Sequence, residues 1–225
     1  MPDRVAAPAL HCFYGGTFDP VHNGHLGIAR VARDQLQTTV RLLPAADPPH
    51  RPAPGADAGQ RARMLELAIE GQTGLAVDRR EIDREGLSYT VDTLRQLRAE
   101  LGATQPLALL VGADSFVSLP EWREWRALFG LAHFVVAERS GTELVLEGEL
   151  AAASAGRRAQ SAEDLKHRPA GLIFGLHQPL LPESASEVRQ RIADGRPWRH
   201  LLPAAVAAFI EVNRLYTRSA TAGPL

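Results

Sequence analysis

Two histidines, His22 and His25, lie three residues apart in the stretch YGGTFDPVHNGHL at residues 14–26. The glycines that precede them can adopt positive φ and have no side chain, so we expect Gly15 and Gly16 to end a strand and expose backbone N–H groups to a ligand. Apolar residues then repeat with helical spacing, which would place both imidazoles at the positive end of a helix. Together these groups suit several phosphate oxygens. The stretch therefore predicts a phosphate site.

Each part of this stretch also has a plainer explanation. A Gly-Gly pair is often only a turn. Two histidines at this spacing also occur as ordinary surface residues or as half of a metal site. The combination of all the parts favours the phosphate site.

Short apolar runs alternate with amphipathic segments along the chain, which is typical of an α/β protein. The clearest strand is 106–111, which is apolar throughout, as a central parallel strand is. Further strands are expected at 10–14, 39–43, 75–78, 133–137 and 171–176, and helices after residue 22 and at 57–71, 88–101, 121–129, 184–192 and 203–216. The pattern predicts a Rossmann-like, doubly wound, mostly parallel sheet of five or six strands with helices on both faces. Such sheets bind ligands at the carboxyl ends of their strands.

Three polar features can be placed on these elements. Ser88 is expected to be the N-cap of the helix that follows it. Glu81 and Asp83 lie among arginines, a pattern that favours a solvated or salt-bridged segment over a pair of catalytic carboxylates. Asp114 follows a strand, where it could equally bind a ribose or cap a helix.

Length and composition limit the classes of function. The chain has 225 residues and a formal net charge of −1, so it is expected to form one domain over residues 1–216, with a variable insertion at 142–168 and a flexible tail at 217–225. A near-neutral chain gives no global attraction to nucleic acid or to an anionic membrane. Cys12 is the only cysteine, and no apolar run approaches the ~20 residues that span a bilayer. We expect a cytoplasmic protein without nucleic-acid or membrane partners.

The stretch GGTFDPVHNGH at residues 15–25 resembles the signature of the nucleotidylyltransferase superfamily, whose HxGH motif matches residues 22–25. Later segments resemble the nicotinate-nucleotide adenylyltransferases: PPHRP at 48–52, SYT at 88–90, a G-x-D motif at 112–114 and LPEW at 119–122. Residues 183–189, ESASEVR, resemble the second motif, ISxTxxR. There Ser184 and Arg189 match, whereas Glu183 replaces the usual apolar residue and Ser186 the usual threonine. The resemblance covers residues 10–140 and 170–216.

The resemblance implies transfer of AMP from ATP to nicotinate mononucleotide, giving nicotinate adenine dinucleotide and pyrophosphate. It assigns catalysis to His22, His25 and Arg189, which would stabilise charge on the phosphates. On the ATP side it places Gly15, Gly16, Thr17, Phe18, His22, His25, Gly112, Asp114, Ser184, Ser186 and Arg189. On the nicotinate mononucleotide side it places His50, Arg51, Tyr89, Thr90, Trp122 and Arg139, with Trp125 left to packing.

The same resemblance implies Mg²⁺ carried by the ATP phosphates, with no dedicated set of protein ligands. A homo-oligomer is left open. Three rival functions remain to be weighed. Another adenylyl- or cytidylyltransferase, such as the phosphopantetheine enzyme, is disfavoured by the PPHRP, SYT and tryptophan segments. A metal-dependent phosphohydrolase using His22, His25 and His50 would need further carboxylates. A non-catalytic nucleotide sensor would be free to lose a histidine or Arg189, and the chain keeps them.

Overall fold

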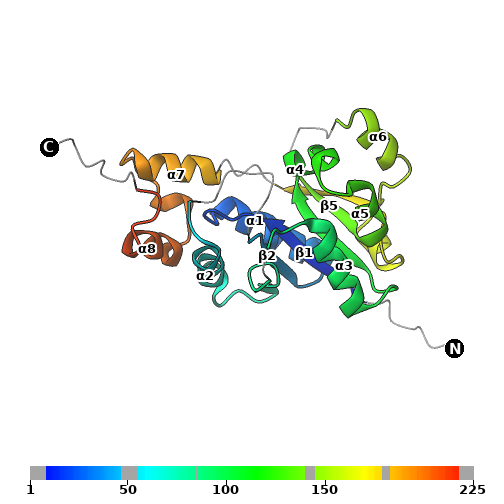
Figure 1. Cartoon of the computed structure of the whole chain (residues 1–225), viewed down its shortest axis with the longest axis horizontal. Coiled ribbons are helices and arrows are strands. Elements are labelled where there is room, and N and C mark those ends of the chain that lie inside the picture. Colours follow the sequence, from blue (N-terminus) through cyan, green and yellow to red (C-terminus); the bar gives the residue numbers. More distant parts are fainter. Residues whose placement is uncertain (1–8, 47–54, 85, 140–144, 179–182, 218–225) are drawn as a thin grey trace.

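The computed structural model describes residues 9–46, 55–84, 86–139, 145–178 and 183–217. Six strands alternate with helices along these residues (Figure 1). The strands are β1 (His11–Gly16), β2 (Val40–Pro44), β3 (Leu75–Val77), β4 (Leu107–Gly112), β5 (His133–Arg139) and β6 (Ile173–Gln178). The helices are α1 (Asn23–Leu36), α2 (Ala58–Ile69), α3 (Thr90–Leu101), α4 (Ala113–Val117), η1 (Leu119–Glu121), α5 (Trp125–Leu131), α6 (Gly148–Ser154), η2 (Glu163–Lys166), α7 (Ala185–Ala193), η3 (Arg199–Leu201) and α8 (Ala204–Val212).

All strand pairings are parallel, and the strand order is β3-β2-β1-β4-β5-β6. β1 is central, since Cys12 pairs with Val40 of β2 on one side and with Ala108 of β4 on the other. The strand order reverses at this point, so a crevice opens beyond the carboxyl ends of β1 and β4. The predicted doubly wound parallel sheet is confirmed. It places the glycine pair at the reversal point.

Two hydrophobic cores cover the two faces of the sheet. Successive side chains of a strand point to opposite faces, so Cys12 and Tyr14 enter one core with residues of α1, α2 and α8. Phe13 enters the other core with residues of α3, α4 and α5. Figure 1 shows the corresponding arrangement, with α2 and α8 to one side of the sheet and α3, α4 and α5 to the other. Helices on both faces were predicted, and the structure confirms them.

Several predicted boundaries are wrong by a few residues. The final helix ends at Val212 instead of Tyr216. The predicted helix 121–129 is interrupted, because Glu124 has φ 51° and α5 begins only at Trp125. The segment 145–168, expected to hold short surface helices, contains α6 and η2, each of which buries one leucine in the body of the protein. Among the described residues, no helix is long and apolar enough to cross a membrane.

Candidate active site

The two histidines of the HxGH motif hold each other at the start of α1. His22 is the N-cap, and its Nδ1 accepts a hydrogen bond from the backbone N–H of His25 at 3.4 Å. The Nδ1 of His25 in turn accepts from the backbone N–H of His22, also at 3.4 Å. The arrangement is a capping box built from two imidazoles. It explains why the helix begins here and fixes both rings.

These hydrogen bonds determine which nitrogen carries the proton. Because both Nδ1 atoms accept, each neutral ring has its proton on Nε2, which can donate to a ligand. Burial lowers the pKa of His22 to about 4, so its ring is neutral at pH 7. The rings lie close together, with centroids 3.7 Å apart. The pair is therefore suited to donating two N–H groups to an anion.

Glycine is required at two places around these rings. A Cβ on Gly24 would lie 2.9 Å from Nδ1 of His22, closer than atoms normally approach. A Cβ on Gly16 would lie 3.0 Å from the ring of Phe18, which in turn packs edge-on to His25 at 5.0 Å. Neither Gly15 nor Gly16 has positive φ, because both belong to β1. The expectation that the pair ends a strand is confirmed, since β1 ends at Gly16, but positive φ plays no part there, and the close approach of the Phe18 ring is the reason for Gly16.

The second motif lies beside the first. Ser184 is the N-cap of α7 and accepts from the backbone N–H of Glu187 at 3.1 Å. The carbonyl of Glu183 lies 3.4 Å from the Cβ position of Gly24, so the starts of α7 and α1 are neighbours. The Oε2 of Glu183 is buried and has no hydrogen-bond partner among the described residues. The unusual acid of this motif therefore lies next to the histidine pair.

Arg189 joins the second motif to the loop after β1. Its Nη1 donates to the carbonyl of Asp19 at 2.5 Å, and its Nη2 donates to Ser186 Oγ at 3.3 Å. The Asp19 carboxylate accepts from the N–H groups of Gly55 and Ala56 and from the hydroxyl of Tyr216. Arg189 therefore contacts a buried aspartate that ties together the loop after β1, residues 55–56, α7 and Tyr216.

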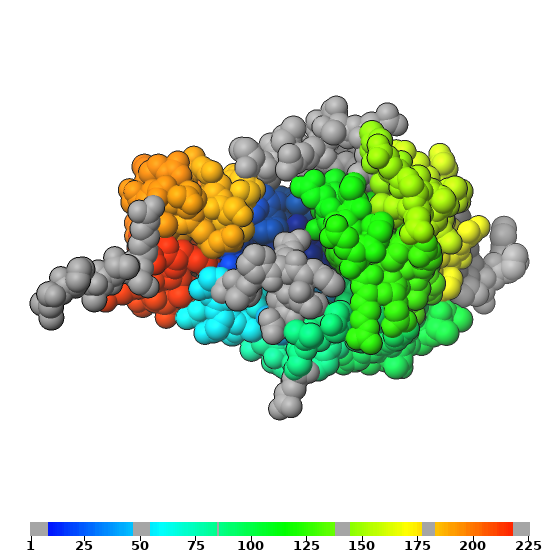
Figure 2. Space-filling view, turned by 45° about the horizontal axis from the view of Figure 1, so that its top comes forward, coloured from blue at the N-terminus to red at the C-terminus, as the bar shows by residue number. Residues whose placement is uncertain are grey.

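A cavity of about 330 Å³ opens on the other side of the glycine pair. It is lined by Gly15, Gly16, Thr17, Leu43, Ala45, Glu81, Ser88, Tyr89, Thr90, Thr93, Leu94, Leu109, Val111, Ser115, Ser118, Glu121, Trp122 and Arg123. Figure 2 shows the first elements of the chain recessed between the parts that carry α4 and α7. Thr17 lines this cavity, while the next residue, Phe18, packs against His25. The turn after β1 thus separates an apolar cavity from the histidine pair.

The predicted acceptor residues fall into two groups. Tyr89, Thr90 and Trp122 line the cavity, and Trp125 is buried in the core, 6% exposed. His50 and Arg51 lie outside the described residues, as does the side chain of Arg139 at the end of β5. On the ATP side, Gly112 is the N-cap of α4 and Asp114 lies exposed in the first turn of that helix. Neither of these two lines the cavity.

Three charged residues around the cavity were missed by sequence reasoning. Arg61, treated as part of a helical face, is 1% exposed and donates to the carbonyls of Thr17, Ala45 and Ala46 at 2.5–2.8 Å. Arg123 lines the cavity with its guanidinium 4.7 Å from the centroid of Tyr89. The third residue is Glu81.

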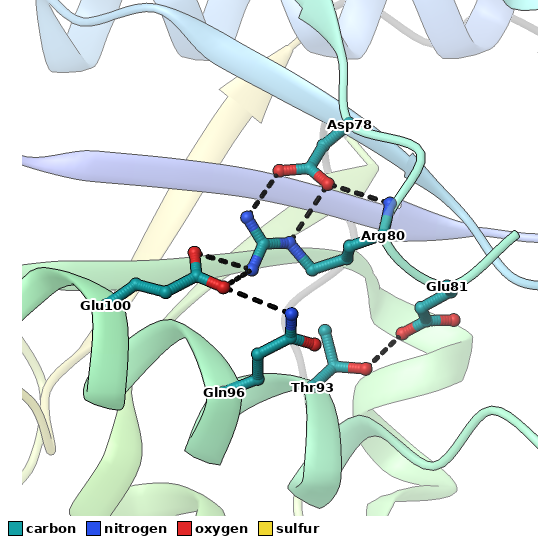
Figure 3. A network of polar contacts seen from close by, with 6 residues as sticks. All are labelled: Asp78, Arg80, Glu81, Thr93, Gln96 and Glu100. Carbon is teal, nitrogen blue, oxygen red and sulfur yellow. Dashed lines mark hydrogen bonds and ion pairs between the residues drawn. The ribbon is translucent and has the colours of Figure 1, made fainter. Parts of the chain in front are cut away.

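Glu81 corrects two predictions. It is 6% exposed, so it is not solvated, and its Oε1 accepts from Thr93 Oγ1 at 2.7 Å (Figure 3). Burial raises the pKa of this carboxyl. Ser88, expected to cap α3, hydrogen-bonds Glu81 instead, while Tyr89 occupies the N-cap position and no side chain caps the helix. The rest of the charged segment is salt-bridged as predicted, with Asp83 paired to Arg79.

Comparison with known proteins decides the family. The sequence profile of the cytidylyltransferase-like family matches residues 13–191. A relative from Stenotrophomonas maltophilia, named probable nicotinate-nucleotide adenylyltransferase, is 59% identical over 92% of this chain and 97% of its own. A relative of the same name from Marinobacter nauticus is 49% identical over 92% of this chain and 96% of its own. The chain belongs to the nicotinate-nucleotide adenylyltransferases.

Solved structures of nicotinate-nucleotide adenylyltransferases share the fold. The Plasmodium falciparum nicotinic acid mononucleotide adenylyltransferase, in a structure described as complexed with NaAD, is 16% identical with a TM-score of 0.64, over 91% of this chain and 96% of that one. A Vibrio parahaemolyticus protein described as a putative member is 14% identical with a TM-score of 0.56, over 92% and 95% of the chains. The predicted fold and family are both confirmed.

Members of this superfamily generally use a divalent metal ion with the nucleoside triphosphate. Among the described residues no group of three or more His, Cys, Asp or Glu side chains is arranged to hold a metal. The groups facing the cleft near α1 and α7 are imidazole N–H donors and a guanidinium, which suit anions. Such donors fit a metal ion that arrives bound to phosphates.

Proposed function

We propose that this protein transfers AMP from ATP to nicotinate mononucleotide, releasing pyrophosphate. The observation that carries the proposal is the pair of imidazoles fixed at the start of α1, separated by the turn after β1 from a cavity lined by Tyr89 and Trp122. A nucleotidyl transfer needs both parts, since one must stabilise phosphates and the other must hold an acceptor. The 59% identity to a relative named for this activity supports the same reaction.

The reaction needs no nucleophile from the protein. An oxygen of the nicotinate mononucleotide phosphate forms a bond to the α-phosphorus of ATP, and the bond from that phosphorus to the β-phosphate oxygen breaks. In our proposal His22 and His25 donate their Nε2 protons as hydrogen bonds to the phosphates at this centre. Because both rings are already fixed by the capping box, little reorganisation is needed as charge develops.

The remaining ATP contacts come from the second motif and the strand ends. We assign the triphosphate to Arg189 and to the start of α7, with Ser184 and Ser186, because a guanidinium beside a helix N-terminus attracts phosphate oxygens. Gly15 and Gly16 at the end of β1, with Thr17 and Phe18 just after them, would separate the two substrates. Gly112 and Asp114 would contact the nucleotide. Mg²⁺ would enter with ATP and lower the negative charge on its phosphates.

The acceptor would occupy the cavity. We propose that the nicotinate ring stacks on Trp122 and that its carboxylate meets the N–H groups at the start of α3, near Tyr89 and Thr90, where no side chain caps the helix. Arg123 adds a positive charge at this cavity. His50, Arg51 and Arg139 stay predicted members of the acceptor site. The cytoplasmic location, the lack of a nucleic-acid partner and any oligomer also stay predictions.

The acceptor assay tests the proposal directly. The protein is incubated with Mg²⁺ and ATP, and with either nicotinate mononucleotide or nicotinamide mononucleotide, while pyrophosphate release is followed. We expect release to be far faster with the nicotinate compound. His25→Ala, which removes one Nε2 donor, is expected to lower kcat by about 10²–10³-fold. If neither acceptor yields pyrophosphate, the transferase function is refuted, and full activity after exhaustive chelation would contradict the role of Mg²⁺.

A further inference from the structure

Glu81 is a buried carboxyl group in the acceptor cavity that the proposed reaction does not use. It is 6% exposed and lies just after β3, four residues beyond the end of that strand. A carboxylate in such a place requires hydrogen-bond partners, because burying a charge without them is costly. Its partners are therefore informative about its role.

Both partners of Glu81 lie at the start of α3, and one of them also contacts the segment after β2. Thr93, 1% exposed in the second turn of α3, donates its hydroxyl to Oε1 of Glu81 at 2.7 Å. Ser88, two residues before the start of α3, also hydrogen-bonds this carboxylate. The Ser88 Oγ in turn accepts the backbone N–H of Ala46 at 3.3 Å. A single carboxylate therefore links the start of α3 to the segment that follows β2.

An ion-pair network fixes the backbone that carries Glu81. Arg80 bonds both oxygens of Asp78 at 2.9 Å and Glu100 of α3 at 3.0 Å, and its own N–H donates to Asp78 (Figure 3). Successive side chains point in different directions here, so Arg80 faces Glu100 while Glu81 faces Thr93. Arg80 and its partners hold residues 78–81 on the side away from the cavity, and Glu81 holds the same residues on the cavity side.

We propose that Glu81 is a positioning residue for the acceptor substrate: its carboxylate holds Ser88 and Thr93 so that the start of α3 keeps the geometry that receives the ligand's anionic ring substituent. The inference rests on the proposed function, because it deepens the assignment of this cavity to nicotinate mononucleotide. Glu81 is not a general base in this scheme, since the reaction requires none and its carboxylate oxygens receive hydroxyl donors.

The positioning role predicts a selective effect on one substrate. Glu81→Ala removes the acceptor of both hydroxyls, so we expect KM for nicotinate mononucleotide to rise about 30-fold while KM for ATP stays within twofold. Glu81→Gln keeps the shape and can still bond the two hydroxyls, so it should restore KM to within about threefold of wild type. Glu163→Ala is the control, because Glu163 lies in η2, pairs with Lys166 and does not line the cavity. It should leave both KM values unchanged.

The two hydroxyl partners provide a second test. Thr93→Val and Ser88→Ala should each raise KM for nicotinate mononucleotide about fivefold in the wild-type background. Neither should raise it further once Glu81 is alanine, because residues that act through one network are not additive. Binding of nicotinate mononucleotide measured by calorimetry should weaken by the same factors.

Two results would overturn the inference. One is a Glu81→Ala protein that binds nicotinate mononucleotide as wild type does, even if its melting temperature falls. The other is an equal rise in both KM values, which would mark a general structural defect. Failure of the underlying function is separate, since in that case the wild-type protein itself would release no pyrophosphate with this acceptor.

Discussion

Gly24→Ala should displace the histidine rings at the start of α1 while leaving the stability of the protein nearly unchanged. The new Cβ would lie 2.9 Å from Nδ1 and 3.0 Å from Cε1 of His22, whereas ordinary contacts begin at 3.4 Å. The ring must therefore move by at least about 0.5 Å. Its neighbour His25 limits that movement, because the ring centroids are only 3.7 Å apart. We expect the Nε2–H donor of His22 to lose its position.

The free energy of unfolding should change little in this variant. Alanine is favoured over glycine in a helix by about 1 kcal/mol, and loss of the histidine N-cap costs about 1 kcal/mol. These opposing effects nearly cancel, so the melting temperature should stay within about 3 °C of wild type. A donor displaced by about 0.5–1 Å, by contrast, can lower kcat about 10²-fold. Catalysis should fall while the fold survives.

Gly59→Ala is the matched control for this experiment. Gly59 has the same place in α2 as Gly24 has in α1, the second residue of a helix that starts with a capping box. Its new Cβ would meet only Asp57 Oδ1, at 3.3 Å, on an exposed side chain. Pyrophosphate release and thermal unfolding would be measured for both variants. A Gly24→Ala protein that keeps the kcat of the Gly59→Ala protein would refute the requirement for fixed rings.

Three further variants test charges around the site. Burial lowers the pKa of His22 from 6.5 to about 4, so folding favours its neutral form. This effect adds up to about 3 kcal/mol to the free energy of unfolding, which is fully present above pH 6.5 and is lost as the pH falls towards 4. In urea unfolding, His22→Gln should lose less stability over that pH range than wild type. Arg123→Gln should lower the preference for nicotinate over nicotinamide mononucleotide about tenfold in competition assays, whereas Arg126→Gln, whose arginine stacks on Trp125 away from the cavity, should leave it unchanged. Arg61→Met should destabilise the protein by about 3 kcal/mol and lower its melting temperature by about 6–12 °C, because three carbonyls lose a buried donor; an unchanged melting curve would contradict this role.

The histidine half of the site could be predicted from the sequence because its determinants are local. The two imidazoles are three residues apart, so a helix start alone brings them together. The sheet was predictable for a similar reason, since each buried parallel strand is an apolar run that can be recognised by itself. The Trp122 and Trp125 pair shows the limit. Their spacing suggested one helix, but the backbone turns at Glu124, which lets Trp122 face the cavity while Trp125 packs in the core.

The cavity half of the site could not be predicted in the same way. Its polar residues bond to backbone carbonyls and hydroxyl groups far away in the sequence, and the residue types alone do not indicate these partners. Arg61 bonds backbone carbonyls from segments 15 to 44 positions away, and every residue has a carbonyl. Glu81 lies among arginines, yet its carboxylate accepts a hydrogen bond from Thr93, in a helix that begins nine residues later. A run of charged residues indicates a solvent-exposed segment only when no other element packs over it. Here α3 packs over one side of the charged segment. Arg80 therefore forms an outer ion pair with Glu100, whereas the adjacent Glu81 lies in the cavity wall.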